Sequence, residues 1–151
     1  MSDAAATADR AAGQRAAYVH IPFCHRRCPY CDFAVVDLSE QRASIERYVD
    51  ALIAEIAMEP PWQPLHAVNL GGGTPSILHP ADVQRVVDAL KARFGFEPGA
   101  EISIEANPED WTGEHAAALR SSGLNRVSLG VQSFDAEVLK ALGRAHEPRM
   151  G

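Results

Sequence analysis

The spacing of apolar residues along the chain changes between the period of a helix and that of a strand. Between residues 39 and 59, apolar side chains fall alternately three and one positions apart, which places them on one face of a helix. Residues 101–105 instead alternate polar and apolar, as a half-buried strand does. Extended along the chain, these two periods predict strands at 17–23, 67–70, 101–105 and 126–131, and helices at 39–59, 80–94, 112–122 and 135–142.

Several predicted helices begin or end at residues that suit helix ends. Ser39 fits an N-cap, and Pro80 fits a first helical turn because the amide that proline lacks has no partner there. Gly95 fits a helix stop. Three apolar side chains of the last helix are expected to face inward: Val138, Leu139 and Leu142.

Strands and helices alternate in about four βα units, which predicts an α/β fold with a parallel sheet and helices outside it. Four units are too few to close a barrel, which needs about eight. Residues 1–16 are Ala-rich and polar and are expected to form a disordered tail, so the folded domain is expected to span 17–151. Because the sequence stops soon after its last predicted helix, we expect this domain to be incomplete.

Composition narrows the class of protein. The 14 basic and 20 acidic side chains give a formal net charge of −6, which argues against a broad nucleic-acid-binding surface. No segment approaches the roughly 18 consecutive apolar residues of a membrane span. The three cysteines are odd in number and closely spaced, a poor pattern for disulfides, so we expect a cytoplasmic protein with reduced thiols.

The cysteines Cys24, Cys28 and Cys31 have C-x3-C-x2-C spacing on one short predicted loop. A closed structural metal site needs four protein ligands, whereas three ligands leave one position open for chemistry. In a [4Fe–4S] cluster, which four thiolates normally hold, a missing cysteine leaves one iron free for an outside ligand. The alternative is a zinc site with His20 or His25 as fourth ligand, although structural zinc sites usually pair two separated ligand clusters.

Other candidate residues follow the predicted strands, as the cysteine loop does. In parallel α/β sheets, ligands bind beyond the carboxyl ends of the strands, so these residues are expected to meet at one rim. The candidates are the turn at 71–75, Glu105 with Asn107, and Gln132 with Ser133.

Each candidate also has a purely structural explanation. The glycines at 71–73 let the backbone approach a ligand, or simply form a strand-to-helix turn. Glu105 would accept from ribose hydroxyls or an ammonium group, or face water; Gln132 would bind a ligand or shape a turn. Tyr30 would stack on an aromatic ring or pack against the protein. Arg144, taken alone, indicates only a solvated residue near a helix end.

Together these motifs resemble those of radical S-adenosylmethionine (SAM) proteins. The similarity runs from Tyr18 to about His146 and includes YVHIPFC with the cysteine triplet, GGGTP, EISIEANP and LGVQSF. It implies a partial (β/α) barrel with a [4Fe–4S] cluster at its mouth, held by the three cysteines. SAM would bind the open iron through its amino and carboxylate groups, and one-electron reduction would cleave it to a 5′-deoxyadenosyl radical.

The resemblance also implies which residues contact SAM. Direct contacts would come from Tyr18, Gly72, Glu105, Gln132 and Arg144. Further contacts to its nucleotide part would come from Gly73, Thr74 and the backbone at Tyr30.

Within this superfamily the chain is most similar to the oxygen-independent coproporphyrinogen III oxidase family. The oxidases carry a fourth cysteine two residues after the third, where this chain has Phe33. The chain therefore resembles the HemW branch, whose members bind heme and deliver it to partner proteins, with the heme site expected beyond this chain. Two alternatives remain open: an oxidase that decarboxylates the propionates of coproporphyrinogen III, and a zinc-stabilised structural module.

Overall fold

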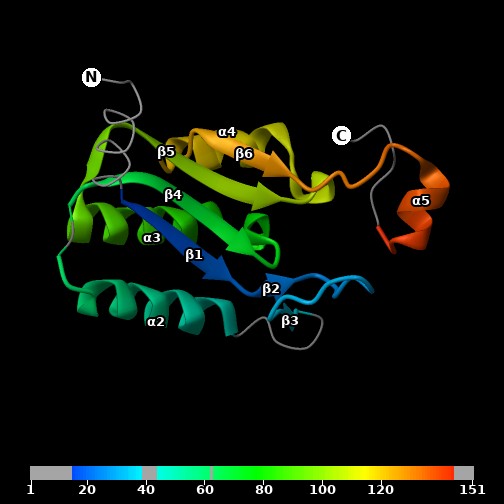
Figure 1. The fold of residues 1–151 in the computed structure, drawn as a ribbon, viewed down its shortest axis with the longest axis horizontal. Coiled ribbons are helices and arrows are strands. Elements are labelled where there is room, and N and C mark those ends of the chain that lie inside the picture. Colours follow the sequence, from blue (N-terminus) through cyan, green and yellow to red (C-terminus); the bar gives the residue numbers. More distant parts are fainter. Residues whose placement is uncertain (1–14, 39–43, 62, 145–151) are drawn as a thin grey trace, which may run out of the picture.

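The computed structural model describes residues 15–38, 44–61 and 63–144, in which strands and helices alternate (Figure 1). The strands are β1 (Ala16–Ile21), β2 (Phe23–Cys24), β3 (Val36–Asp37), β4 (Leu65–Gly72), β5 (Phe96–Ala106) and β6 (Arg126–Leu129). The helices are α2 (Ser44–Met58), α3 (Pro80–Phe94), α4 (Gly113–Ser121) and α5 (Ala136–Ala141). Two short 3-10 turns, η1 (Pro75–Ile77) and η2 (Pro108–Asp110), follow β4 and β5.

The main sheet is parallel, with strand order β1-β4-β5-β6. Each of these strands pairs with the next one of the sheet along the chain, without the reversal of order that marks a doubly wound sheet. Such sequential order is that of a (β/α) barrel wall, in which a helix follows each strand. The α/β prediction with a partial barrel is therefore confirmed.

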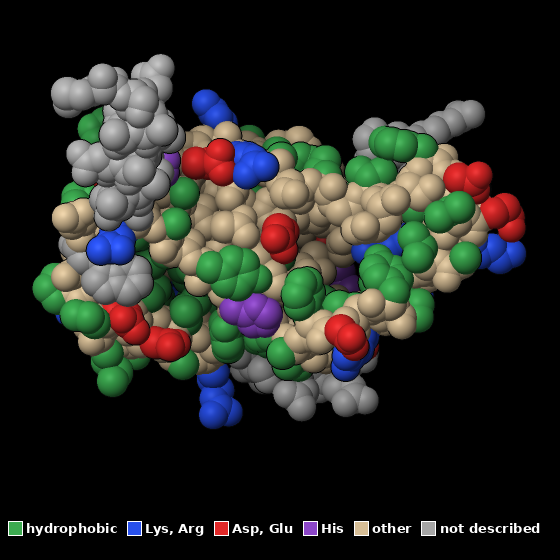
Figure 2. Space-filling view, in the orientation of Figure 1, with side chains coloured by type: hydrophobic (Ala, Val, Ile, Leu, Met, Phe, Trp, Pro, Cys, Tyr) green, Lys and Arg blue, Asp and Glu red, His purple; other side chains and the backbone are tan. Residues whose placement is uncertain are grey.

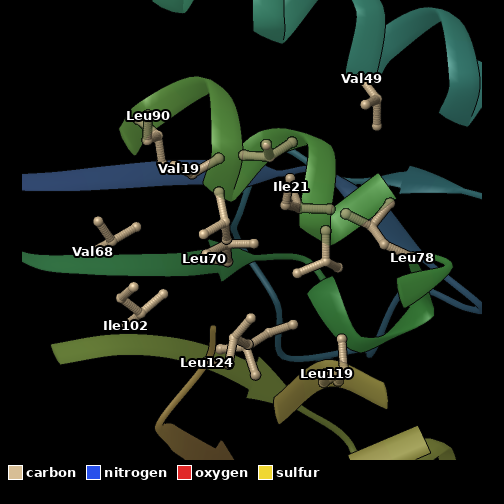
Figure 3. Packing of buried hydrophobic residues seen from close by; sticks show 14 of the residues in the cluster. Val19, Ile21, Val49, Val68, Leu70, Leu78, Leu90, Ile102, Leu119 and Leu124 are labelled. Atoms are coloured by element: carbon tan, nitrogen blue, oxygen red, sulfur yellow. The ribbon is translucent and has the colours of Figure 1, made fainter. Parts of the chain in front are cut away.

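One face of the sheet packs against the helices. Because side chains alternate across a strand, Val19, Val68 and Ile102 point to the same layer, where they meet Val86 and Leu90 of α3. Figure 3 shows Val19, Val68, Ile102 and Leu90 among the buried side chains between the strands and the helices. This apolar layer stabilises the fold, since burying an aliphatic side chain fully contributes about 1.5–3 kcal/mol.

The other face of the sheet is polar and open. The register places Tyr18 beside Asn69 and Asn69 beside Ser103, so these side chains form a row across three strands. Glu105 and Ser128 form the next row toward the carboxyl ends of β5 and β6. In a barrel this face lines the interior, so the fold presents polar groups where a ligand would lie.

The predicted elements are present, with differences at their ends. The helix α3 spans the predicted residues, and Gly95 follows it with φ +74°. β1 begins at Ala16, one residue before the predicted strand. The predicted N-cap Ser39 and residues 1–14 of the predicted tail lie outside the described residues.

The expectation that Val138 faces inward is wrong. Val138 is 45% exposed, whereas Leu139 is 2% exposed. The helix α5 stands beyond the carboxyl ends of the strands (Figure 1), so it meets the rest of the protein on a narrow side instead of lying across the sheet. None of the helices in the described part of the chain has the length and apolar character needed to cross a membrane.

Truncating a core side chain should test the packed layer. Leu70 is fully buried at the centre of the sheet, so Leu70→Ala should lower the free energy of unfolding by about 2–5 kcal/mol. The matched control is Met58→Ala, because Met58 is 84% exposed and its loss should change that free energy by about 0.5 kcal/mol or less. Chemical denaturation measures both, and equal effects would contradict the packing described.

Candidate functional site

The cysteine loop is closed at its base by a two-stranded parallel ladder. β2 pairs with β3, the amide of Val36 donates to the carbonyl of Pro22 at 2.8 Å, and the amide of Leu38 donates to the carbonyl of Cys24 at 2.9 Å. The loop therefore leaves and re-enters the fold at the carboxyl end of β1, the end at which parallel α/β proteins bind ligands.

The three cysteines of this loop are free thiols. Cys24 is buried, while Cys28 and Cys31 are partly exposed. The amide of Cys31 donates to the carbonyl of Cys28 at 3.1 Å, and the guanidinium of Arg27 donates to the carbonyl of Cys31 at 3.1 and 3.3 Å, which fixes the tight turn.

Among residues 15–38, 44–61 and 63–144, no three His, Cys, Asp or Glu side chains lie close enough together to hold one metal ion. In a [4Fe–4S] cluster each thiolate binds a different iron, so the sulfurs are spread around a larger object than a single ion.

The glycine turn after β4 lies directly against the base of the cysteine loop. The amide of Gly73 donates to the carbonyl of Ile21 at 2.8 Å, and the amide of Thr74 donates to that of Phe23 at 2.7 Å. A Cβ atom at position 73 would lie 2.5 Å from the carbonyl oxygen of Phe23, so only glycine allows this contact. Gly72 has φ +114°, which also favours glycine.

Thr74 links the glycine turn to the first thiol. Its hydroxyl donates to the Sγ of Cys24 at 3.6 Å and accepts from the side-chain amide of Asn107 at 3.3 Å. Burial raises the pKa of the Cys24 thiol, the Thr74 hydrogen bond opposes this rise, and the negative charges of Cys31 and Cys28 add to it. The thiol of the apoprotein therefore stays protonated to higher pH than an ordinary cysteine.

Glu105 is held at the end of β5 with its carboxylate over the open face. One oxygen accepts from the amide of Gly72 at 3.1 Å, and the other lies 3.5 Å from the side-chain amide of Asn69. Tyr18 is close enough that burial and the charge of Glu105 raise the pKa of its hydroxyl. The carboxylate thus points to the same space as the glycine turn.

Arg144 reaches back from the segment after α5 to the cysteine loop. Its Nη2 donates to Asn107 Oδ1 and to the carbonyl of Gly130, both at 2.7 Å, and its Nη1 lies 3.8 Å from Cys28 Sγ. Its Nε is buried and has no hydrogen-bond partner among the described residues. Gln132, in the preceding loop, has a φ of +64°, which is rare for a residue other than glycine.

These residues line one hollow of ≈ 280 Å³ at the carboxyl ends of the strands. Figure 2 shows the open face of the sheet hollowed toward α5. The predicted site residues on its wall are Cys24, Cys28, Tyr30, Cys31, Gly72, Gly73, Thr74, Glu105, Gln132 and Arg144. Tyr18 is 59% exposed and does not line this hollow, although it lies next to Glu105 on the open face.

Sequence reasoning predicted that these side chains meet, but it missed other residues of the wall. Arg26 and Arg27 line the hollow from within the cysteine loop, and the Arg26 guanidinium donates to the carbonyl of Gly143. Their position between Cys24 and Cys28 could have indicated from the sequence that they lie at the site. Phe33, which the sequence analysis named, also lines the hollow, and 62% of it is exposed.

The family model described as the radical SAM superfamily matches residues 18–150. The chain belongs to the radical SAM superfamily. It is 40% identical over 139 residues to the heme chaperone HemW of Synechocystis sp., covering 89% of this chain and 34% of that protein. It is 37% identical over 133 residues to the oxygen-independent coproporphyrinogen III oxidase of Escherichia coli, covering 86% of this chain and 29% of that enzyme.

The solved structure of coproporphyrinogen III oxidase (HemN) from Escherichia coli, described as a radical SAM enzyme, matches with a TM-score of 0.79 at 34% identity. The match covers 91% of this chain and 33% of that one. The chain thus spans about a third of the length of the relatives that it matches.

The residues of the hollow fit the cofactors of this superfamily. Three free thiols on one wall are suitable donors for an iron–sulfur cluster. In the same hollow, Glu105 offers an acceptor, and the buried Nε of Arg144 is a donor without a partner in the described part of the chain. A polar ligand with both amino and carboxylate groups matches such a pair.

Substituting Gly73 should disturb the contact between turn and loop. In Gly73→Ala the new methyl group meets the Phe23 carbonyl, so the free energy of unfolding should fall by about 1–3 kcal/mol and the amide of Thr74 should exchange with solvent faster. Gly113→Ala is the matched control, because a Cβ atom at position 113 would meet no heavy atom within 4 Å and alanine favours the helix that begins there. Similar behaviour of the two variants in hydrogen exchange would contradict the role of Gly73.

Removing the Thr74 hydroxyl should make Cys24 less reactive in the apoprotein. Thr74→Val deletes the hydrogen bond that lowers the Cys24 pKa, so the pKa should rise further and less thiolate should be present at a given pH. Alkylation of Cys24 between pH 7 and 10, followed by peptide mass spectrometry, should be slower than in the wild type. Thr112→Val, which removes a hydroxyl that caps α4, should leave that rate unchanged, and an unchanged rate in Thr74→Val would count against the predicted effect.

Proposed function

We propose that this chain binds a [4Fe–4S] cluster and SAM as part of a heme chaperone of the HemW type. The observation that supports it most is the hollow that joins three free thiols to the glycine turn, Glu105 and Arg144. Cluster and SAM binding are properties expected of the superfamily to which the chain belongs. Together the two cofactors supply one-electron chemistry, and the protein supplies binding and orientation.

In this proposal the cysteine loop holds the cluster, with Cys24, Cys28 and Cys31 as ligands to three irons. Metal ligation requires deprotonated cysteines, so loading releases the proton that burial retains on Cys24 in the apoprotein. The buried sulfur accepts a hydrogen bond from Thr74, which stabilises its thiolate form.

Other residues that line the hollow would bind SAM. Glu105 is suited to accept from the amino group or ribose hydroxyls, and Arg144 is suited to donate to the carboxylate. Gly72, Gly73 and Thr74 present a backbone that a ligand can approach closely. Gln132 and Tyr30, which line the hollow, and Tyr18, which lies next to Glu105, would complete the contacts.

The assignment to the HemW type depends on Phe33. Where the oxidase sequence carries a fourth cysteine, this chain has an exposed phenylalanine on the wall of the hollow. The 40% identity to a heme chaperone supports the same choice. The partners would then be heme and heme-accepting proteins. Heme would bind outside the described residues, and the protein would act in the cytoplasm.

A second candidate is an oxidase that removes propionate carboxyl groups from coproporphyrinogen III. The 37% identity to the Escherichia coli enzyme and the TM-score of 0.79 with the solved oxidase favour this possibility. The same hollow would serve both functions. They differ in whether the protein binds and delivers heme or decarboxylates coproporphyrinogen III.

Removing one thiol should abolish the cluster. Anaerobic reconstitution of the wild type with iron and sulfide should give the broad visible absorbance of a [4Fe–4S] protein and, after reduction, an EPR signal. Cys28→Ala should lose both, because two thiolates are too few to hold the cluster. Ser121→Ala, on the exposed surface of α4, is the control and should reconstitute normally. An unchanged EPR signal in Cys28→Ala would contradict the ligand assignment, and stoichiometric zinc without iron would favour a zinc module.

Chaperone and oxidase are separated by two assays on the same reconstituted protein, extended by whatever coding sequence follows Gly151. A HemW-type protein should bind heme in a saturable titration and release no carbon dioxide from coproporphyrinogen III. Decarboxylation that depends on SAM would instead establish the oxidase.

A further inference from the structure

A network of three hydrogen-bonded side chains joins the cysteine loop to both 3-10 turns at the rim. The Nε2 of His25 lies 2.9 Å from Oδ1 of Asp110, and the hydroxyl of Ser76 donates to Oδ2 of the same carboxylate at 3.0 Å. A carboxylate can only accept, so Nε2 of His25 carries the proton that it donates. His25 belongs to the cysteine loop, Ser76 to η1 after β4, and Asp110 to η2 after β5.

Within this hydrogen-bonded network, Ser76 and Asp110 are more buried than His25. Ser76 is 3% exposed, and the Asp110 side chain is 13% exposed with both oxygens engaged. The backbone amide of Asp110 donates to the carbonyl of Asn107 at 3.1 Å, which closes η2. The His25 side chain is 54% exposed. The two turns therefore determine the position of His25 and of the loop segment that carries it.

His25 directly follows Cys24, the one buried thiol of the triplet. The Thr74 hydroxyl donates to Cys24, and His25, the next residue, donates to Asp110. Farther along, the loop is tied by the Arg27 guanidinium to the carbonyl of Cys31. Without the Asp110 contact, the segment between Cys24 and Arg27 has fewer bonds to the framework.

We infer that Ser76 and Asp110 position His25 so that the cysteine loop is ordered before a cluster binds. His25 is thus a positioning residue, which acts through the Asp110 carboxylate bound to its Nε2. This inference rests on the proposed function for the identity of the cluster, but the order of the loop is a property of the apoprotein. Outer contacts of this kind typically change metal affinity by about 10- to 100-fold.

The test compares His25→Ala with wild type in two states. In the apoprotein, amide hydrogen exchange across residues 25–37 should become about 10-fold faster in His25→Ala. After reconstitution, the cluster should be lost to an iron chelator about 10-fold faster, as followed by visible absorbance. His25→Gln keeps an N–H donor without an ionisable ring, so it should restore most of both properties.

His66→Ala is the matched control. His66 also faces a carboxylate, Glu97, at 3.8 Å, but it lies at the amino end of β4, opposite the rim. Its removal should change neither the exchange of the cysteine loop nor the loss of the cluster. Equally faster exchange and cluster loss in His25→Ala and His66→Ala would assign the effect to the loss of any surface histidine and would overturn the inference.

The remaining outcomes are also decisive. Wild-type exchange and cluster retention in His25→Ala would overturn the inference while leaving the proposed function intact. If the wild type takes up no cluster, the proposed function fails, and the exchange of the apoprotein alone decides whether His25 orders the loop. If His25→Ala does not fold, Ser76→Ala replaces it: faster exchange of residues 25–37 supports the inference, and unchanged exchange overturns it.

Discussion

The close backbone contact between the glycine turn and the cysteine loop determines the geometry of the whole rim. Two amides, those of Gly73 and Thr74, donate to carbonyls at the junction of β1 and β2, and the absence of a Cβ at position 73 makes this approach possible. The contact brings the Thr74 hydroxyl to Cys24 and the amide of Gly72 to Glu105. The thiols and the Glu105 carboxylate thereby line one hollow, although they are about 80 positions apart in sequence.

The sheet contributes the second constraint. Side chains alternate between its two faces along each strand, and this alternation determines which residues line the hollow. Val68 and Leu70 are buried under the helices, so Asn69 between them must face the open side. The same parity turns Glu105 to the open side of β5 and places it beside Ser128 of β6. A slip of one residue in register would exchange the polar and apolar faces, so burial of the aliphatic layer also fixes the position of the functional side chains.

Much of this arrangement follows from local sequence. Pro80 and Gly95 bound α3 because each suits its end of a helix, and the rim was predictable because parallel strands bring their carboxyl ends to one edge. Contacts between distant segments could not be predicted in the same way. The pairing of β2 with β3 involves two residues on each strand, too few to show a period, and the exposure of Val138 depends on where α5 stands relative to the sheet. Likewise, no spacing rule connects His25 to Asp110 or Arg144 to Asn107.

In the function that we propose, three thiols leave one iron of a [4Fe–4S] cluster open to SAM. Mössbauer spectroscopy of the wild-type chain reconstituted with 57Fe tests it most directly, because it distinguishes the iron sites of one cluster. We predict that adding SAM changes the parameters of a single iron and leaves the cysteine-bound irons unchanged. A spectrum that does not respond to saturating SAM, or a protein that retains no cluster, would contradict the account.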